Sequence, residues 1–339
     1  MQILERTVTG GRICGSSLLY LKGILYMPRL KPFLNYQDQI NNLITKKGLT
    51  INNPSFAEEK LKEIRYYALI DGYKSIFYDY TTRTYLPGAT FEDIVNLYDF
   101  DEELRLLVFK YICHIEQRIR SQISYYFCDK YSSSQNDYLN PNHYNYSRRN
   151  MGGINKLVQI LTYNANNSSA HDYIIYQRRK YQNVPLWAVV NTLTIGQISK
   201  MYSYMQSDIQ SRISHCYEAV NERELRQHLK VITDFRNVCA HNERLFLYHS
   251  HTDIPDTVLH KKLGVPKTGS NYSVGKNDLF AIVIALRYLL PKNDFKQFYK
   301  QLRAIIASYR KKSSEDNTSK LLDSMGFHST WNTILRYKP

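Results

Sequence analysis

Apolar residues recur every three to four positions along most of this chain, which is the spacing that places them on one face of an α-helix. The longest run covers residues 101–131, where Leu104, Leu107 and Tyr111 fall on one side. A second strong run covers residues 221–241. The same spacing predicts helices at 35–47, 55–72, 154–163, 172–181, 195–205, 208–217, 278–290 and 294–310, and short helices near Leu321 and Trp331.

Several predicted helices begin or end at residues that favour helix ends. Gly48 follows the first run, and glycine is common just after the last residue of a helix. Ser55 with Glu58 forms a capping box for the second helix, and Thr90 with Asp93 opens the next one.

Three stretches lack a helical pattern. Residues 76–88 are rich in β-branched and aromatic side chains and predict a loop or at most a short hairpin. Residues 132–150 are polar and predict an exposed connection, and residues 246–276 predict a long irregular segment. Because no series of strands, no alternation of strands with helices and no repeat is present, the expected fold class is all-α.

The chain carries 45 Lys and Arg against 30 Asp and Glu, and its net charge of +15 attracts polyanions. A single basic cluster is usually a solvated face, but together the clusters favour an RNA or DNA partner over an acidic small molecule. The 30 tyrosines have two interpretations: they could stack on unpaired bases, or they could be core residues, which is favoured for most of them. The basic clusters are Arg118/Arg120, Arg148/Arg149, Arg178/Arg179/Lys180, Lys261/Lys262 and Arg310/Lys311/Lys312.

Composition argues against several classes of protein. With 43% hydrophobic residues, 14 Gly and 10 Pro, the chain is neither collagen-like nor disordered. Five scattered cysteines without a CxxC pair argue against a disulfide framework or a structural zinc site and favour a reducing cytoplasm. The apolar stretch 16–27 is about half of the ~20 residues that a membrane span needs, and no cleavage site follows it. Neither a membrane segment nor secretion is expected.

The run Arg236-Asn237-Val238-Cys239-Ala240-His241, at the end of a predicted helix, is the strongest candidate for chemistry. Asn237 and His241 share a helical face, and the long side chain of Arg236 can lean across to it. A histidine can accept and donate protons near neutral pH, and a guanidinium can hold phosphate oxygens, as metal-free RNA cleavage requires. On spacing alone, the favoured explanation is structural: a helix-terminal histidine that caps carbonyls beside an exposed arginine.

Residues 236–246 (RNVCAHNERLF) resemble the R-[ND]-x-x-x-H signature of the HEPN superfamily of RNases, in the form seen in abortive-infection proteins of the AbiD/AbiF type. Residues 27–51 resemble that family's N-terminal opening, and residues 185–202 resemble its Trp-then-Gly segment. Residues 98–123 resemble its central helix, with Asp99, Arg105, Glu116 and Arg120 in place.

The resemblance implies a HEPN-like helical bundle with extra N-terminal and C-terminal helices. Residues 1–26 would be an extension outside the family, with Met27 as a candidate start. Residues 27–95 would be an N-terminal helical region and residues 96–339 the helical core with the C-terminal helices. One continuous domain from residue 27 is the alternative.

The resemblance also implies roles for the motif. Arg236 would stabilise the phosphorane, His241 would act as acid or base, and Asn237 would orient them. The products would carry 2′,3′-cyclic phosphate and 5′-hydroxyl ends. Because HEPN nucleases generally build their cleft from two such motifs and this chain has one, a homodimer is expected. RNA is the expected partner, as substrate and as a small structured regulatory RNA.

Other residues carry two interpretations each. Glu116 matches the acidic residue of the preceding HEPN helix, and an ordinary salt bridge to Arg120 explains it equally well. Arg244 would contact RNA phosphate or neutralise the surroundings of Glu243. Cys239 is expected to be a buried apolar side chain rather than a nucleophile. The residues expected to bind RNA are Arg118, Arg120, Arg148, Arg149, Arg178, Arg179, Lys180 and Arg244.

No metal and no other cofactor is expected. His249, His251 and His260 lie near Asp253 and Asp256, but no second group of ligands follows at a suitable spacing. No Walker loop, GxSxG, GxGxxG or HExxH motif occurs.

The function expected from these observations is that of a toxin-type, metal-independent endoribonuclease of an abortive-infection system, restrained until phage attack. The alternative is a catalytically silent RNA-binding or phage-sensing protein with the same fold. A purely structural interaction protein fits the net charge of +15 less well.

Overall fold

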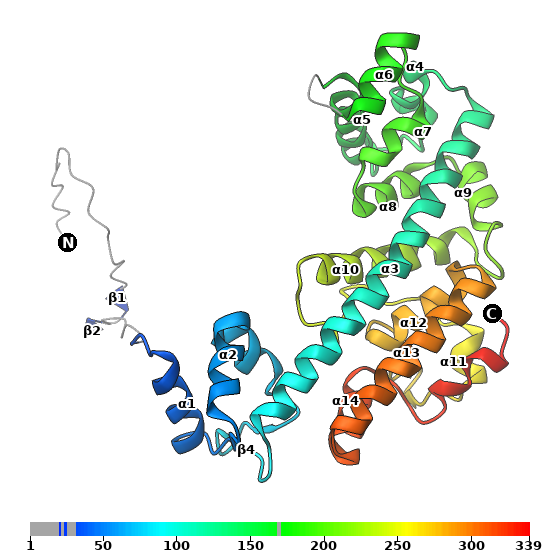
Figure 1. The fold of residues 1–339 in the computed structure, drawn as a ribbon. Coiled ribbons are helices and arrows are strands. Elements are labelled where there is room, and N and C mark those ends of the chain that lie inside the picture. The colour runs from blue at the N-terminus through cyan, green and yellow to red at the C-terminus, as the bar shows by residue number, and fades with distance from the viewer. Residues whose placement is uncertain (1–19, 22–23, 26–31, 168–170) are drawn as a thin grey trace, which may run out of the picture.

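The computed structural model describes residues 20–21, 24–25, 32–167 and 171–339 (Figure 1). The chain is mostly helical, which confirms the expected all-α class. The strands of the described residues have two residues each and pair as three hairpins: β1 (Tyr20–Leu21) with β2 (Ile24–Leu25), β3 (Tyr78–Asp79) with β4 (Thr84–Tyr85), and β5 (Lys267–Thr268) with β6 (Asn271–Tyr272). The expected extension 1–26 and the candidate start Met27 otherwise lie outside the described residues.

The longest helix, α3 (Phe91–Lys130), forms the axis of the molecule. Its 40 residues extend about 60 Å. Thr90 and Asp93 cap it reciprocally, as predicted: Thr90 Oγ1 accepts from the Asp93 N–H at 3.1 Å, and Asp93 Oδ2 accepts from the Thr90 N–H at 3.0 Å. The prediction of a separate helix beginning near residue 101 was wrong, because no Gly or Pro interrupts the segment.

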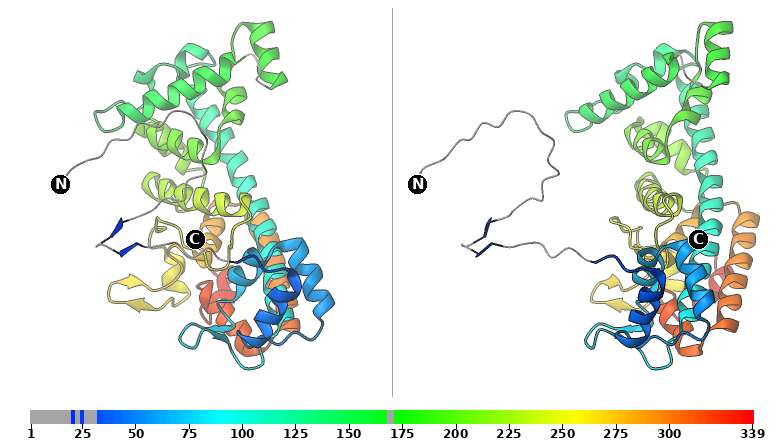
Figure 2. Two further views of the ribbon diagram at one scale, coloured as in Figure 1. Left: turned by 90° about the vertical axis from the view of Figure 1, so that its left-hand side faces the viewer. Right: turned by 60° about the vertical axis from the view of Figure 1, so that its left-hand side comes forward.

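Two helices pack against different sides of α3. Helix α13 (Lys292–Lys312) runs along one side, and α10 (Glu222–Ala240) crosses the other (Figure 2). Helix α12 (Leu279–Leu289) contacts α3, α10 and α13. All of its residues are buried, as expected for a helix that is apolar on every face. This four-helix contact region is the core on which the candidate site is built.

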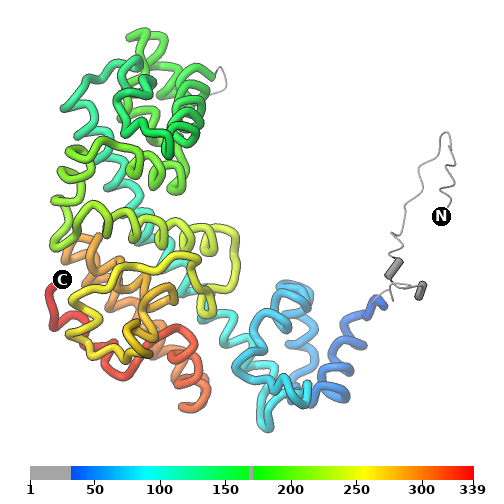
Figure 3. Tube along the Cα trace, turned by 180° about the vertical axis from the view of Figure 1, so that it is seen from behind, coloured from blue at the N-terminus to red at the C-terminus, as the bar shows by residue number. Residues whose placement is uncertain are grey.

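The remaining helices lie toward the two ends of α3 (Figure 3). The first two helices lie beside its N-terminal end, and α4 to α7 form a lobe beside its C-terminal end. The α-helices are α1 (Tyr36–Thr45), α2 (Pro54–Ile64), α4 (Gln135–Tyr138), α5 (Met151–Asn166), α6 (Asp172–Tyr181), α7 (Leu186–Val189), α8 (Ile195–Tyr204), α9 (Ser207–Ser214), α11 (Val258–Lys262) and α14 (Glu315–Ser324). The short 3-10 and π-helical segments are η1 (Tyr67–Asp71), η2 (Pro141–His143), η3 (Val190–Thr192) and η4 (Trp331–Arg336).

The second predicted helix differs from the structure at both ends. Asn53, not Ser55, is the N-cap, and its side chain accepts from the Phe56 N–H at 3.1 Å. Pro54 suits the first helical position because it lacks an N–H group, so the cap falls on the residue before it. The helix ends at Ile64, because Arg65 adopts a left-handed φ of 69°.

The segments without a helical pattern are partly ordered. The hairpin expected within residues 76–88 is confirmed as β3 and β4. Residues 132–150 are not simply an exposed connection, because they contain α4 and η2 and bury Tyr138 and Tyr144 completely. Residues 246–276 contain α11 and the hairpin of β5 and β6.

The expected division at residue 95 falls inside α3, so the N-terminal region and the helical core share one helix. The assignment of domains stays a prediction. Among the described residues, no helix is both long enough and apolar enough to cross a bilayer.

Candidate active site

Helix α10 carries the RNVCAH run and ends inside it. Asn221 and Glu224 form its capping box: Asn221 Oδ1 accepts from the Glu224 N–H at 3.0 Å, and Glu224 Oε2 accepts from the Asn221 N–H at 2.9 Å. The helix ends at Ala240, His241 is its C-cap, and Asn242 is left-handed with a φ of 56°. The helix predicted here is therefore confirmed.

The buried side of α10 decides which way the motif residues face. It packs against α3 and α8. Arg236 lies at the edge of this buried side and is turned toward α3, whereas Asn237 and His241 are exposed. The buried residues of α10 include Leu225, Leu229, Ile232, Phe235 and Val238.

Arg236 meets the carboxylate of Glu116 on α3. The two side chains approach to 4.0 Å between Arg236 Nε and Glu116 Oε2, and the Glu116 side chain is only 7% exposed. The Arg236 guanidinium also lies 5.8 Å from the ring centre of Phe109. Arg120 donates a close hydrogen bond to the other Glu116 oxygen and a second, at 2.7 Å, to the Leu193 carbonyl. The predicted salt bridge between Glu116 and Arg120 is thus confirmed.

This cluster carries more positive than negative charge. Two guanidinium groups, from Arg120 and Arg236, share the single carboxylate of Glu116. The Nε atoms of both arginines are buried and have no hydrogen-bond partner among the described residues. An unpaired buried donor is unfavourable, and an anion or a water that accepts from it removes the penalty. The cluster therefore combines an excess of positive charge with two unsatisfied donors.

Helix α6 carries an exposed tyrosine, Tyr173, which is 41% exposed. Burial raises the pKa of its hydroxyl, and the positive charge of Arg120 acts in the opposite direction. An exposed tyrosine ring can stack on an unpaired base. Sequence analysis missed this residue, because it was one of 30 tyrosines.

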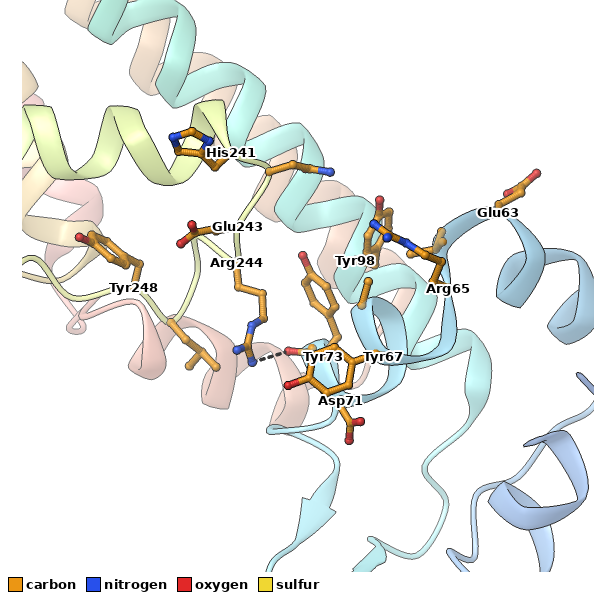
Figure 4. A pocket seen from close by; sticks show the side chains of 15 residues that line it. Glu63, Arg65, Tyr67, Asp71, Tyr73, Tyr98, His241, Glu243, Arg244 and Tyr248 are labelled. Carbon is orange, nitrogen blue, oxygen red and sulfur yellow. Dashed lines mark hydrogen bonds between the residues drawn. The ribbon is translucent and has the colours of Figure 1, made fainter. Parts of the chain in front are cut away.

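His241 lies at the edge of an open cleft of about 760 Å³. Its ring is exposed and forms no hydrogen bond with any other residue that the structure describes. Figure 4 shows it at the end of α10, above Glu243 and Arg244, with Tyr98 and Tyr67 on the opposite wall of the cleft. An exposed imidazole in this position can contact a ligand in the cleft.

Arg236 and His241 do not meet within one chain. No hydrogen bond or ion pair joins Arg236 to Asn237 or His241 among the described residues. Five residues along a helix correspond to a rotation of about 140°, so the guanidinium faces α3 while the imidazole faces solvent. The sequence suggested that all three side chains meet at one spot; within a single chain only Asn237 and His241 share the exposed side.

The loop after His241 is held by a buried acid that sequence analysis did not single out. Asp101 of α3 accepts from the N–H groups of Leu245, at 3.1 Å, and Phe246, at 2.9 Å. It also accepts from the Tyr73 hydroxyl at 2.9 Å and pairs with Arg105 at 2.5 Å. Burial raises the pKa of Asp101, and the Arg105 charge opposes that shift. The sequence feature that could have identified Asp101 is its position among the apolar residues on the buried side of α3, where a carboxylate needs partners.

Residues 59–247 match the model of a protein family described as Abi-like protein. The chain belongs to this family. The match begins within α2, contains all of α3 and α10, and ends one residue after Phe246. It therefore contains Glu116, Arg236 and His241, whereas α11 to α14 lie outside it. No curated protein and no solved structure matches the chain.

Two of the arginines expected to bind RNA are engaged inside this Abi-like protein. Arg118 donates to the carbonyls of Cys216, at 2.8 Å, and Leu289, at 3.0 Å. Arg178 donates to the carbonyls of Ala165 and Asn167, both at 3.2 Å, and so satisfies the end of α5. These contacts favour a structural role for both side chains.

Other expected RNA contacts lie on the surface. Lys180 is exposed, and its ammonium lies 5.3 Å and 5.2 Å from the ring centres of Tyr176 and Tyr181. Arg244 lines the cleft beside His241 and donates to the Gly72 carbonyl at 3.0 Å rather than pairing with Glu243. The exposed arginines of the lobe are Arg148, Arg149 and Arg179.

The histidines after the motif have structural contacts. His260 is buried: Nδ1 accepts from the Thr257 N–H at 3.1 Å, and Nε2 lies 2.8 Å from the Gly275 carbonyl. Burial lowers its pKa to about 4. His249 contacts the Asn277 side chain at 3.1 Å. Within the described ranges, no group of three or more His, Cys, Asp or Glu side chains is placed to hold a metal.

Cys239 lies inside the motif but is poorly suited to act as a nucleophile. Burial raises the pKa of its thiol to about 12, so the reactive thiolate is scarce near neutral pH. The side chain is half-buried and packs against the core, so the expectation of a buried apolar side chain is met only in part.

Proposed function

We propose that this Abi-like protein is an abortive-infection endoribonuclease of the HEPN type, which cleaves RNA without a metal through Arg236 and His241. The observation that carries the proposal is the buried Glu116 carboxylate between two guanidinium groups with unpaired Nε atoms, one of which belongs to Arg236. An exposed histidine follows on the same helix. RNA cleavage by the 2′-hydroxyl requires a cation that holds the phosphate and an imidazole that exchanges protons, and the proposal brings these two groups together across a dimer.

In the proposed reaction the ribose 2′-oxygen attacks phosphorus and the bond from phosphorus to the 5′-oxygen breaks. His241 takes the proton from the 2′-hydroxyl or delivers one to the 5′-oxygen, which leaves a 2′,3′-cyclic phosphate and a 5′-hydroxyl. Arg236 stabilises the charge that develops on the phosphorane oxygens. Neither role requires a metal.

Glu116 acts in this proposal as a positioning residue. Its carboxylate is held by Arg120 and lies within ion-pair distance of Arg236, so it fixes the direction of the Arg236 guanidinium. Asn237 is exposed one turn before His241, and its carbonyl accepts the His241 N–H at 2.9 Å. It orients the histidine through the backbone.

A homodimer completes the proposed site. Each chain has one motif, and within a chain Arg236 and His241 face different directions. A two-fold pair of α10 ends would bring the Arg236 of one chain toward the His241 of the other. RNA would be the substrate, and the surplus of positive charge suits a small regulatory RNA as a further partner in the cytoplasm.

A catalytically silent RNA-binding protein is the second candidate. The same separation of Arg236 from His241 favours it if the chain does not pair with a second copy in this way. The phosphate-binding cluster would then hold RNA without cutting it.

The deciding experiment is RNA cleavage in the presence of EDTA by wild type, Arg236→Ala and His241→Ala. Matched controls are Arg223→Ala, an exposed arginine at the other end of α10, and His251→Ala, an exposed histidine after the motif. We expect only the first two substitutions to abolish cleavage and to relieve toxicity on expression. Cleavage by His241→Ala at the wild-type rate would refute the nuclease, and RNA binding without cleavage by wild type would favour the silent protein.

A further inference from the structure

The outer face of α13 carries a row of cations without acidic partners. Lys296, Lys300 and Arg303 are exposed and follow each other at positions i, i+4 and i+7, which places them on one side of the helix. None of the three forms an ion pair with a described acidic side chain. Like charges at this spacing destabilise a helix, so the row favours the binding of counter-charges.

Helix α13 has the largest net positive charge of the described helices. Helix α13 has seven Lys and Arg against one acid, Asp294, a net charge of +6 over 21 residues. The net charge of the whole chain is +15.

The acids around α13 lie at its two ends. Asp294 lies 3.5 Å from His114 of α3, and Glu315 lies 3.7 Å from Arg310. Asp99 and Glu103 of α3 border Lys312. The middle of the helix therefore keeps an uncompensated positive charge.

The same three cations line a shallow groove. The groove has a volume of about 560 Å³. One wall is formed by Lys296, Lys300 and Arg303, and Leu335 of η4 lies opposite. Arg303 is steadied by the ring of Tyr299, whose centre lies 5.9 Å from the guanidinium.

This face points away from the candidate active site. The buried residues of α13 turn toward α3 and α12, so its exposed residues lie on the far side of the helix. Helix α10 packs against another side of α3, as the two views of Figure 2 show. A ligand on the α13 face would leave the ends of α10 free. The buried residues of α13 are Phe295, Phe298, Tyr299, Leu302, Ile306 and Tyr309.

We infer that the α13 face binds the phosphate backbone of a double-stranded nucleic acid. All four aromatic rings of α13 are buried, so the face offers cations without a surface for stacking on unpaired bases. The lobe differs, because Tyr163, Tyr176 and Tyr181 are each more than half exposed there. Phosphate contacts without base contacts suit a duplex, whose bases are already paired.

The spacing of the three cations agrees with a duplex. Seven residues of helix, from Lys296 to Arg303, span about 10 Å, which covers about three phosphates of one strand at about 3.4 Å each. A bilayer is a poorer match, since Leu335 is the one large apolar side chain exposed at this groove among the described residues.

The test is a binding titration by fluorescence anisotropy at several salt concentrations. All proteins are the full chain and carry His241→Ala, so that the RNA stays intact whether or not the wild type cuts it. The probes are a blunt 20-base-pair RNA duplex, a DNA duplex of the same sequence, and vesicles of anionic lipid. The variant is Lys296→Gln/Lys300→Gln/Arg303→Gln. The control removes three exposed lysines at separate places outside the basic clusters: Lys46→Gln/Lys200→Gln/Lys267→Gln.

We expect the α13 variant to bind duplex at least tenfold more weakly at low salt. The slope of log K against log salt should fall by about 2 to 3, because about 0.9 of a counterion is released for each phosphate contact. For the control, the slope should fall by less than 1. A loss of affinity for both duplexes, or for the RNA duplex alone, supports the inference and identifies the nucleic acid. An unchanged slope, or a loss of affinity for the vesicles alone, overturns the inference. Equal thermal midpoints for variant and control establish that the fold is intact.

Discussion

Asp101, in the first third of α3, accepts a hydrogen bond at 2.9 Å from the backbone N–H of Phe246, which lies 145 residues later in the chain. Through this contact the long helix holds the loop that follows His241. The adjacent N–H of Leu245 binds the same carboxylate at 3.1 Å. The position of the motif's C-terminal end therefore depends on a buried acid outside the motif.

We predict that Asp101→Ala lowers the free energy of unfolding by about 3 kcal/mol, because it leaves the Arg105 charge buried and two N–H groups unpaired. Urea unfolding measures the change. The control is Asp99→Ala, which removes a partly exposed carboxylate from the same helix and should cost less than about 1 kcal/mol. Equal losses for both variants would contradict the role of Asp101.

We predict that Asn242→Gly keeps the stability of the wild type, whereas Asn242→Val lowers it by about 1 to 3 kcal/mol. The residue has a φ of 56°, which glycine adopts freely and a β-branched residue does not. Thermal unfolding measures the difference. A wild-type midpoint for Asn242→Val would show that the turn after His241 carries no conformational requirement.

We predict that Glu116→Gln reduces RNA cleavage by tenfold or more, because the Arg236 guanidinium loses the charge that directs it. The readout is the rate of a single turnover, with thermal unfolding as the check on folding. Glu103→Gln, an exposed glutamate on the same helix, should cleave at the wild-type rate. Wild-type cleavage by a folded Glu116→Gln would remove Glu116 from the site.

We predict that a mixture of Arg236→Ala and His241→Ala proteins recovers cleavage that neither has alone. Random pairing makes half of the dimers mixed, and each mixed dimer holds one intact Arg236–His241 pair from two chains, so about a quarter of wild-type activity is expected. The assay is cleavage after co-refolding or co-expression. No recovery, with dimers present by size-exclusion chromatography, would contradict a site shared between chains.

We predict that acid destabilises the fold below about pH 6.5, partly through His228 and His260. Burial lowers their pKa values from 6.5 to about 3 and about 4. Because the pKa of each histidine is lower in the folded state than in the unfolded state, its contribution to the free energy of unfolding is complete above pH 6.5. This contribution is lost as the pH falls toward the folded-state pKa, by about 1.4 kcal/mol per pH unit for each histidine. Urea unfolding from pH 7 to pH 4.5 measures the slope. His260→Gln should make it shallower, whereas the exposed His251→Gln should not change it.

Local sequence features predict the helices and the candidate chemistry. Most helix ends follow from local features, such as the reciprocal caps of Thr90 with Asp93 and of Asn221 with Glu224. The motif ending in His241 was visible in the same way. Predictions failed where two local signals competed, as when Pro54 placed the cap on Asn53 instead of Ser55.

Which of these residues meet depends on how the helices pack together. Arg236 reaches Glu116 from 120 positions away, and Asp101 binds the loop after α10, because α10 packs across α3 at one particular place. The same packing turns Arg118 and Arg178 toward carbonyls and leaves Lys296 and Lys300 exposed on the far side of α13. Periodicity and capping act over a few residues and fix each helix, whereas the angles and contacts between helices depend on how side chains distant in sequence fill a common core.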